Sequence, residues 1–195
     1  GEETCLRSLL NKDPSYYAYF LNILYKHEDI EEPTTKNIDF NKIFEYSNSI
    51  KFCPGIIEGQ VNYSLLQQWI SDFKELLVKQ HQLYLLESTL GQLFAHSPIG
   101  KDGFEPHESV RQVIESFDGN SNLYSSYISE RLNMRGSYID NAGREEFSLA
   151  NIFKMNSENI VMEYPHTAKI YKTLASCYQK EGEEARKRAE QHSWF

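Results

Sequence analysis

Glycine, proline and cysteine are scarce in this chain of 195 residues, which has 10 glycines, 6 prolines and 3 cysteines. So few chain breakers exclude a collagen-like or low-complexity chain, and a hydrophobic share of 40% argues against intrinsic disorder. The three cysteines, Cys5, Cys53 and Cys177, are odd in number and far apart, which excludes a closely spaced zinc or redox pair. We therefore expect reduced, mostly buried thiols.

Long apolar runs and an excess of basic residues are also missing. No stretch approaches the roughly 20 apolar residues that span a bilayer, and no secretory signal is visible. The formal net charge is −8, which argues against a general attraction to nucleic acid or to an anionic membrane. We expect a cytoplasmic protein that binds neither. Because the chain begins with Gly1 and not with methionine, we also expect a piece of a longer protein.

The sequence instead shows helical periodicity over most of its length. The clearest apolar stripe runs from Leu65 to Leu77 behind Asn62, a candidate N-cap, and another runs from Leu83 to Phe94. These two helices are close in sequence, so we expect an antiparallel pair. Further helices are expected over 14–25, 40–44, 106–117, 123–132, 144–162 and from 165 onward, with polar loops over 47–62 and 134–143.

No stretch alternates with period two, which argues against a sizeable sheet. The sequence predicts an all-α, irregular multi-helix domain of about eight helices. Residues 1–195 are expected to form a single domain. The breakers between Phe52 and Asn62 leave room for a small helical part, 1–55, that packs on 62–195.

The stretch from Gly91 to Glu115 is crowded with turn residues and titratable groups. His96, Asp102 and His107 lie within twelve residues of one another. Imidazole and carboxylate together can bind zinc, manganese or iron, but this spacing matches no known ligand motif. The same residue types also suit the ends of helices, where the helix dipole favours a charge of opposite sign. We keep both interpretations and assign no metal and no cofactor.

Arginines near the two glycine-containing loops are a second group of candidates. A guanidinium can hold a phosphate or a carboxylate of a ligand, or it can pair with a neighbouring acid such as Glu146. The ligand-binding candidates are His96, Asp102, His107, Arg111, Arg135 and Arg144.

The last helix carries a seam of small and aromatic residues. Tyr171, Ala175, Tyr178, Gly182 and Ala185 recur every three or four residues and therefore share one helix face. Such a seam lets another helix approach closely, and these five residues are the interface candidates. The alternative is an ordinary solvated helix end.

Known catalytic and repeat motifs are missing. There is no P-loop, dinucleotide-binding glycine motif, zinc-protease motif or nucleophile elbow. The run from Leu174 to Gly182 is similar to the first helix of a tetratricopeptide repeat, but Lys187 stands where that motif needs a small residue, and no second copy lies about 34 residues away. The sequence therefore gives no reason to predict an enzyme.

Several spaced motifs occur in one order. They are Lys26–Asp29, Gln68–Ile70, Gly91–Pro98, Asp102–Arg111, Arg135-Gly136 and Tyr164–Ala168. In this order the chain resembles a helical region at the C-terminal end of large uncharacterised bacterial proteins. The resemblance implies an architecture and a context, but no activity.

These observations favour a non-enzymatic accessory or protein-interaction domain of a larger bacterial protein. Its partner would be another domain of the parent chain or a separate protein. The alternative is a small helical enzyme or a ligand- or metal-binding protein that uses the loop from His96 to His107 with a nearby arginine.

Overall fold

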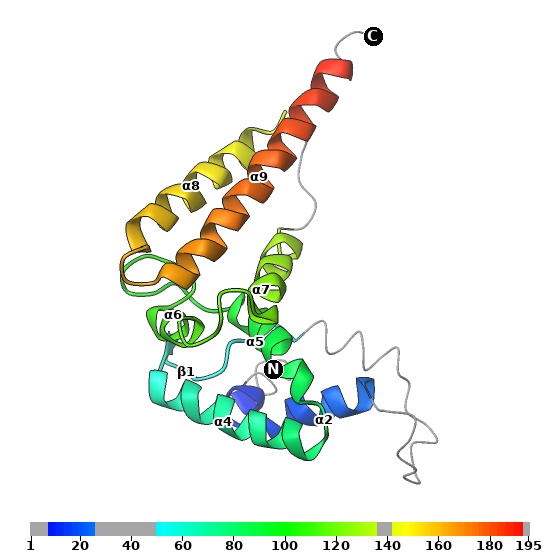
Figure 1. Ribbon diagram of the computed structural model, residues 1–195, viewed down its shortest axis with the longest axis vertical. Helices are drawn as coiled ribbons and strands as arrows, with labels where there is room; N and C mark the ends of the chain where they lie inside the picture. Colours follow the sequence, from blue (N-terminus) through cyan, green and yellow to red (C-terminus); the bar gives the residue numbers. More distant parts are fainter. Residues whose placement is uncertain (1–7, 26–49, 136–141, 193–195) are drawn as a thin grey trace.

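The computed structural model describes residues 8–25, 50–135 and 142–192. The fold is all-α, as predicted, with one very small antiparallel ladder between β1 (Ile56–Ile57) and β2 (Gln60–Val61). Figure 1 shows a body of shorter helices and a long helical hairpin, α8–α9, which extends away from it. The ladder lies inside the stretch 47–62, where the sequence predicted only a loop.

The body contains α2 (Ser15–Leu24), α4 (Tyr63–Lys79), the 3-10 helix η1 (Leu83–Leu85), α5 (Leu86–Phe94), α6 (Glu108–Ile114) and α7 (Asn122–Asn133). The hairpin contains α8 (Arg144–Ile160) and α9 (Pro165–His192). Two predicted helix starts are confirmed. The side chain of Asn62 accepts a hydrogen bond of 3.1 Å from the amide of Leu65, and α9 begins at Pro165.

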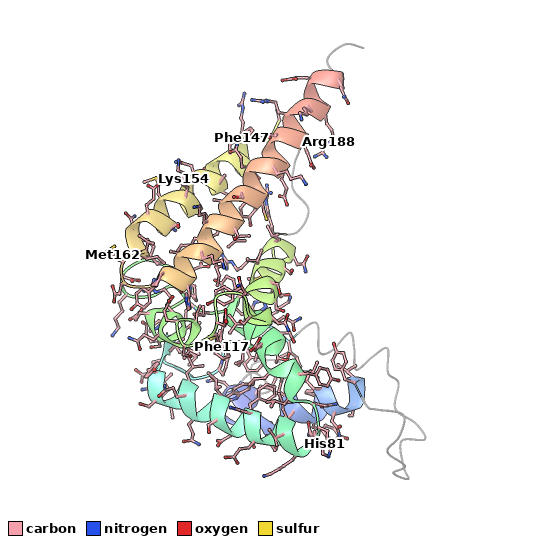
Figure 2. All side chains as sticks on the ribbon, in the orientation of Figure 1. His81, Phe117, Phe147, Lys154, Met162 and Arg188 are labelled. Carbon is pink, nitrogen blue, oxygen red and sulfur yellow. The ribbon has the colours of Figure 1, made fainter. Side chains whose placement is uncertain are left out.

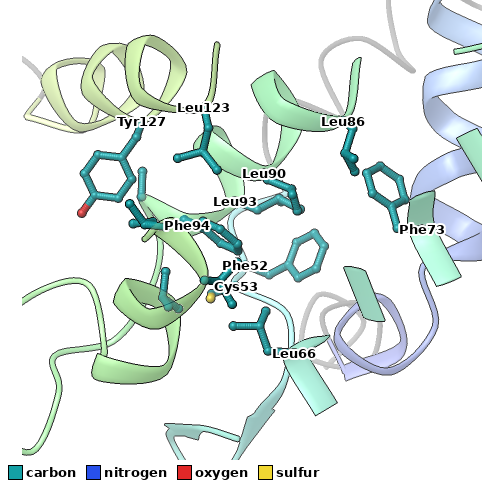
Figure 3. Packing of buried hydrophobic residues seen from close by; sticks show 14 of the residues in the cluster. Phe52, Cys53, Leu66, Phe73, Leu86, Leu90, Leu93, Phe94, Leu123 and Tyr127 are labelled. Atoms are coloured by element: carbon teal, nitrogen blue, oxygen red, sulfur yellow. The ribbon is translucent and has the colours of Figure 1, made fainter. Parts of the chain in front are cut away.

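The apolar stripes of the body meet in one core. Phe52, Leu66, Phe73, Leu90 and Phe94 are among its buried residues, and Figure 3 shows them packed together. Trp69 is 2% exposed, and its indole nitrogen donates a hydrogen bond of 2.9 Å to the carbonyl of Leu10. The described residues before α4 therefore share a core with the rest of the body.

The main partner of α5 is α7, so the predicted pairing of α5 with α4 is wrong. The reason is a glycine on α5. A Cβ atom added to Gly91 would lie 2.2 Å from the carbonyl oxygen of Leu123, which shows that the two helix backbones nearly touch here. Periodicity marked the apolar face of α5 correctly but gave no information on which helix would cover it.

The helix expected from Pro106 begins two residues later. The Glu105–Pro106 peptide bond is cis, His107 is the N-cap, and α6 runs from Glu108 to Ile114. The helix predicted over 40–44 and most of the loop predicted over 134–143 lie outside the described residues.

Glu115, directly after α6, caps the first turn of α9. Its carboxylate accepts hydrogen bonds of 2.9 Å from the backbone amides of His166 and Thr167 and one of 3.0 Å from the Thr167 hydroxyl. The first amides of a helix have no partner within the helix, and an anion at this end is also favoured by the helix dipole. Glu115 therefore attaches the start of α9, at the turn of the hairpin, to the body.

We expect Gly91→Ala to destabilise the protein by about 1–3 kcal/mol, because the new methyl group would overlap the backbone of α7. Gly119→Ala is the matched control, since the nearest atom to its added Cβ is 3.7 Å away, and we expect a change within about 0.5 kcal/mol. Urea denaturation measures both values. Equal effects of the two substitutions would show that the α5–α7 contact is looser than described.

Candidate functional site

The body buries one positive charge completely. The side chain of Arg111, in α6, is 0% exposed, and its Nη2 donates to the carboxylate of Asp102 in a short ion pair. The guanidinium carbon lies 4.7 Å from the ring centre of Tyr164 and 5.8 Å from that of Phe104. Burying a charge is unfavourable unless it is paired, and here one carboxylate and two aromatic rings compensate it.

The compensation of Arg111 is incomplete, because its Nε and Nη1 atoms are buried without a hydrogen-bond acceptor. The nearby hydroxyl of Tyr171 donates to the carbonyl oxygen of Glu105. Burial raises the pKa of Tyr171 to about 12, although the positive charge of Arg111 acts in the opposite direction. Residues of the loop, of α6 and of α9 thus meet around this guanidinium.

His107 serves as a neutral helix cap. Its Nδ1 accepts a hydrogen bond of 3.1 Å from the amide of Ser109, and its Nε2 lies 3.1 Å from the side-chain oxygen of Gln60. This arrangement requires the proton on Nε2. Burial is the main reason why the pKa of His107 lies below 6.5, with a further lowering by Arg111 and a partial offset by Glu108.

His96 contacts a different helix. Its Nε2 lies 2.8 Å from the carboxylate of Glu130 in α7, which also accepts a hydrogen bond of 2.7 Å from Lys51. Burial lowers the pKa of His96, and Glu130 offsets this only in part. Burial alone would raise the pKa of Glu130, but the hydrogen bonds from Lys51 and His96 bring it below its usual value.

Of the candidates in the loop, only Asp102 and Arg111 form an ion pair with each other. His96 and His107 have separate partners within the protein. Within residues 8–25, 50–135 and 142–192, no group of three or more histidine, cysteine, aspartate or glutamate side chains is placed to hold a metal ion.

Arg135 pairs with acids of the hairpin. Its Nη2 lies 2.5 Å from Glu146, and its Nη1 lies 3.3 Å from Glu181. Its guanidinium carbon is 5.6 Å from the ring centre of Tyr178. Although burial acts to lower the pKa of Arg135, the interaction with Glu146 raises it above its ordinary value. Arg144 is exposed at the first residue of α8.

Most residues of the predicted seam on α9 contact α8 of the same chain. Tyr171, Tyr178, Gly182 and Ala185 are buried. The ring of Phe153 lies 5.7 Å from the rings of both tyrosines. A Cβ atom added to Gly182 would lie 2.9 Å from the ring of Phe147. Within the described structure, the helix that approaches this seam is α8.

An elongated groove of about 900 Å³ runs between α8 and α9. Ala150 of α8 and Ala168, Ala175 and Ser176 of α9 contribute small side chains to it. Figure 2 labels two further lining residues, Phe147 and Lys154, which follow each other along α8. The groove therefore has small side chains on both helices and extends over several helical turns, with Phe147 as a bulky residue of its lining.

The charge of the groove differs in sign from that of the whole chain. Lys154, Lys169 and Lys172 line it, whereas Glu158 is its single acidic lining residue, so the groove is locally basic in a chain of net charge −8. Sequence reasoning missed these lysines. In the sequence, Lys169 and Lys172 lie close to Ala168 and Ala175. This spacing indicates a basic groove only when the position of α8 is known.

Comparison with protein-family models, with curated proteins and with solved structures finds no match for this chain. In the part of the chain that the structure describes, no helix is both long and apolar enough to span a bilayer. The groove and the cluster around Arg111 are therefore the features of the molecule that bear on its function.

We expect stability to fall as the pH drops below about 6.5. The folded protein keeps His107 neutral, whereas the unfolded chain takes up a proton near the ordinary histidine pKa of 6.5, so acid favours unfolding. His107→Asn keeps an acceptor for the Ser109 amide and removes the titration. Its melting temperature should change less than that of the wild type between about pH 7.5 and about pH 5.5.

The control is His81→Asn, since His81 is exposed and has a positive φ of 57° that asparagine tolerates. This variant should keep the pH dependence of the wild type. If His107→Asn also keeps it, then His107 is not a group that makes stability depend on pH.

Proposed function

We propose that this chain is a protein-interaction domain whose α8–α9 groove binds an amphipathic helix with acidic residues beside its apolar stripe. The groove is the observation that carries the proposal. Binding of a helix in such a groove is a common recognition mode, in which apolar side chains at i, i+3 or i+4 and i+7 enter the groove.

The small side chains of the groove allow close approach of a third helix. Ala150 lies on α8, and Ala175 and Ser176 lie on α9, so neither helix presents a bulky side chain at these positions. Packed helices usually lie 8–10 Å apart, the lower values requiring small residues at the contact, so a third helix of roughly this spacing fits. Such packing would bury the apolar stripe of the partner.

The lysines select the charge of the partner. Lys154 lies on α8, and Lys172 lies on α9, so basic residues come from both helices that form the groove, and both are exposed. Lys169 is held by the carbonyl of Gly119 at 2.7 Å and by Asn120 at 3.0 Å. Acidic residues on both sides of a partner's apolar stripe would pair with the free lysines and speed the encounter.

A non-enzymatic role is supported by the contacts of the histidines, because His96 and His107 are both engaged by groups of the protein itself. From the resemblance described above, we further propose that the domain belongs to a larger bacterial protein and acts in the cytoplasm. The acidic helix would belong to another protein or to another part of the parent chain.

A fluorescent helical peptide tests the proposal. The peptide has about 18 residues, or roughly 27 Å of helix, with leucines at i, i+3 and i+4 spacing and glutamates on both sides. We expect the double variant Lys154→Glu and Lys172→Glu to bind it at least about tenfold more weakly than the wild type, because attraction becomes repulsion. Fluorescence anisotropy measures the affinity.

The control is Lys180→Glu, which makes one charge reversal at an exposed position of α9 outside the groove lining. It should bind the peptide nearly as well as the wild type. A second peptide with lysines in place of the glutamates should bind poorly. Binding that is indifferent to the double variant, or stronger for the lysine peptide, would overturn the proposed site.

A further inference from the structure

The buried guanidinium of Arg111 has more N–H donors than it makes hydrogen bonds. A guanidinium has five N–H donors in a fixed plane, and here the whole side chain is buried while Nε and Nη1 make no hydrogen bond. Buried donors nearly always have an acceptor, so an exception of this kind points to a missing partner. Asp102 bonds to Nη2 alone, and the other polar group beside the guanidinium is the hydroxyl of Tyr171, which donates its own proton to the carbonyl of Glu105.

We propose that Arg111 is the binding residue for an external carboxylate group, and that Asp102 occupies its place when no ligand is bound. This site is separate from the helix-binding groove, because neither Arg111 nor Asp102 lines that groove. The two proposals can therefore fail independently.

Asp102 is suited to leave the guanidinium. Its side chain is 43% exposed although its partner is fully buried, so it covers Arg111 from the solvent side. It lies between Gly100 and Gly103 in an exposed turn. Gly103 has a φ of +85°, and no atom lies within 4 Å of an added Cβ there, so the turn has open space beside it. Outward rotation of Asp102 would break its ion pair and the hydrogen bond of 3.2 Å that its Oδ1 accepts from the amide of Phe104, and it would open the solvent side of the guanidinium.

A carboxylate fits the surroundings better than a more highly charged anion. The planar fork of a guanidinium matches the two oxygens of a carboxylate. The rings of Phe104 and Tyr164 lie near the guanidinium and would contact an apolar substituent of the ligand. Glu108 lies on the same segment, and its negative charge opposes a dianion such as phosphate, whereas the charge of Glu105 is paired with Arg131 at 2.7 Å.

Restoring a deleted carboxylate from solution tests this proposal. Asp102→Ala removes the resident group and leaves a buried charge without a partner, which should lower the melting temperature. We expect acetate to raise that temperature again by about 3 °C or more and in a saturable way, whereas chloride at the same ionic strength should not. The double variant Asp102→Ala with Arg111→Met should show no such response.

A second measurement serves if Asp102→Ala fails to fold. The Nε–H resonance of Arg111 in the wild type and in Asp102→Asn is followed by NMR during titration with acetate. We expect a saturable shift at lower acetate concentration in Asp102→Asn, since the competing charge is gone. The proposal is overturned if acetate changes the melting temperature of Asp102→Ala no more than chloride does. When that variant does not fold, the proposal is overturned if acetate shifts the Arg111 resonance no more than chloride does in the wild type and in Asp102→Asn.

The source of the carboxylate is distinguished with two further probes. N-acetyl-alanyl-alanine carries a terminal carboxylate like that of a protein chain, and its C-terminal amide is the matched control. Binding of the acid at least about tenfold more tightly than acetate, with no binding of the amide, indicates a chain terminus as ligand. Equal binding of acetate and the acid indicates a small free carboxylate. Equal shifts with the acid and the amide would contradict a carboxylate site.

Discussion

The arrangement of body and hairpin depends on the burial of Arg111 between α6, the loop that precedes it and the start of α9. A buried charge restricts which groups can lie beside it, because these groups have to compensate the charge. Asp102 supplies the opposite charge, and Tyr164 supplies a ring face directly before α9. Glu115, four residues after Arg111, caps the helix that follows Tyr164. The contacts of Arg111 and Glu115 thus position the start of α9, at the turn of the hairpin, and with it the groove.

A second arginine, Arg135, also pairs with a carboxylate beside an aromatic ring, and its partners lie farther along the hairpin. Arg135 binds Glu146 of α8 and Glu181 of α9, beside the ring of Tyr178. Between the two arginines, Ile170 and Leu174 belong to the core of the body. The α9 helix therefore packs on the body and on α8 and still lines the groove. One helix thus contributes both to stability and to a candidate binding surface.

The local features of the fold could be predicted from sequence, and the long-range ones could not. The cap at Asn62, the start of α9 at Pro165 and the apolar faces follow from residues close together in the chain. Periodicity does not reveal which helix covers a face, so α7 as the partner of α5 was missed. For the same reason Arg111 was named as a candidate without its aromatic neighbours, and the groove lysines were not recognised. For His96 and His107 two interpretations stayed open, because the deciding partners, Glu130 and Gln60, are far away in sequence.

The α9 helix is covered by other elements over its first half but less at its end, and this difference affects its local unfolding. Its first half is covered by both the body and α8, whereas its last turns continue past the first residue of α8, as Figure 1 shows. Backbone amides exchange with solvent according to the free energy of local opening, which follows the burial around them. Amide protection should therefore decline along α9, from high values near Leu174 to low values near Glu190. The hairpin thus joins a rigid base to an end that opens readily while the body stays folded.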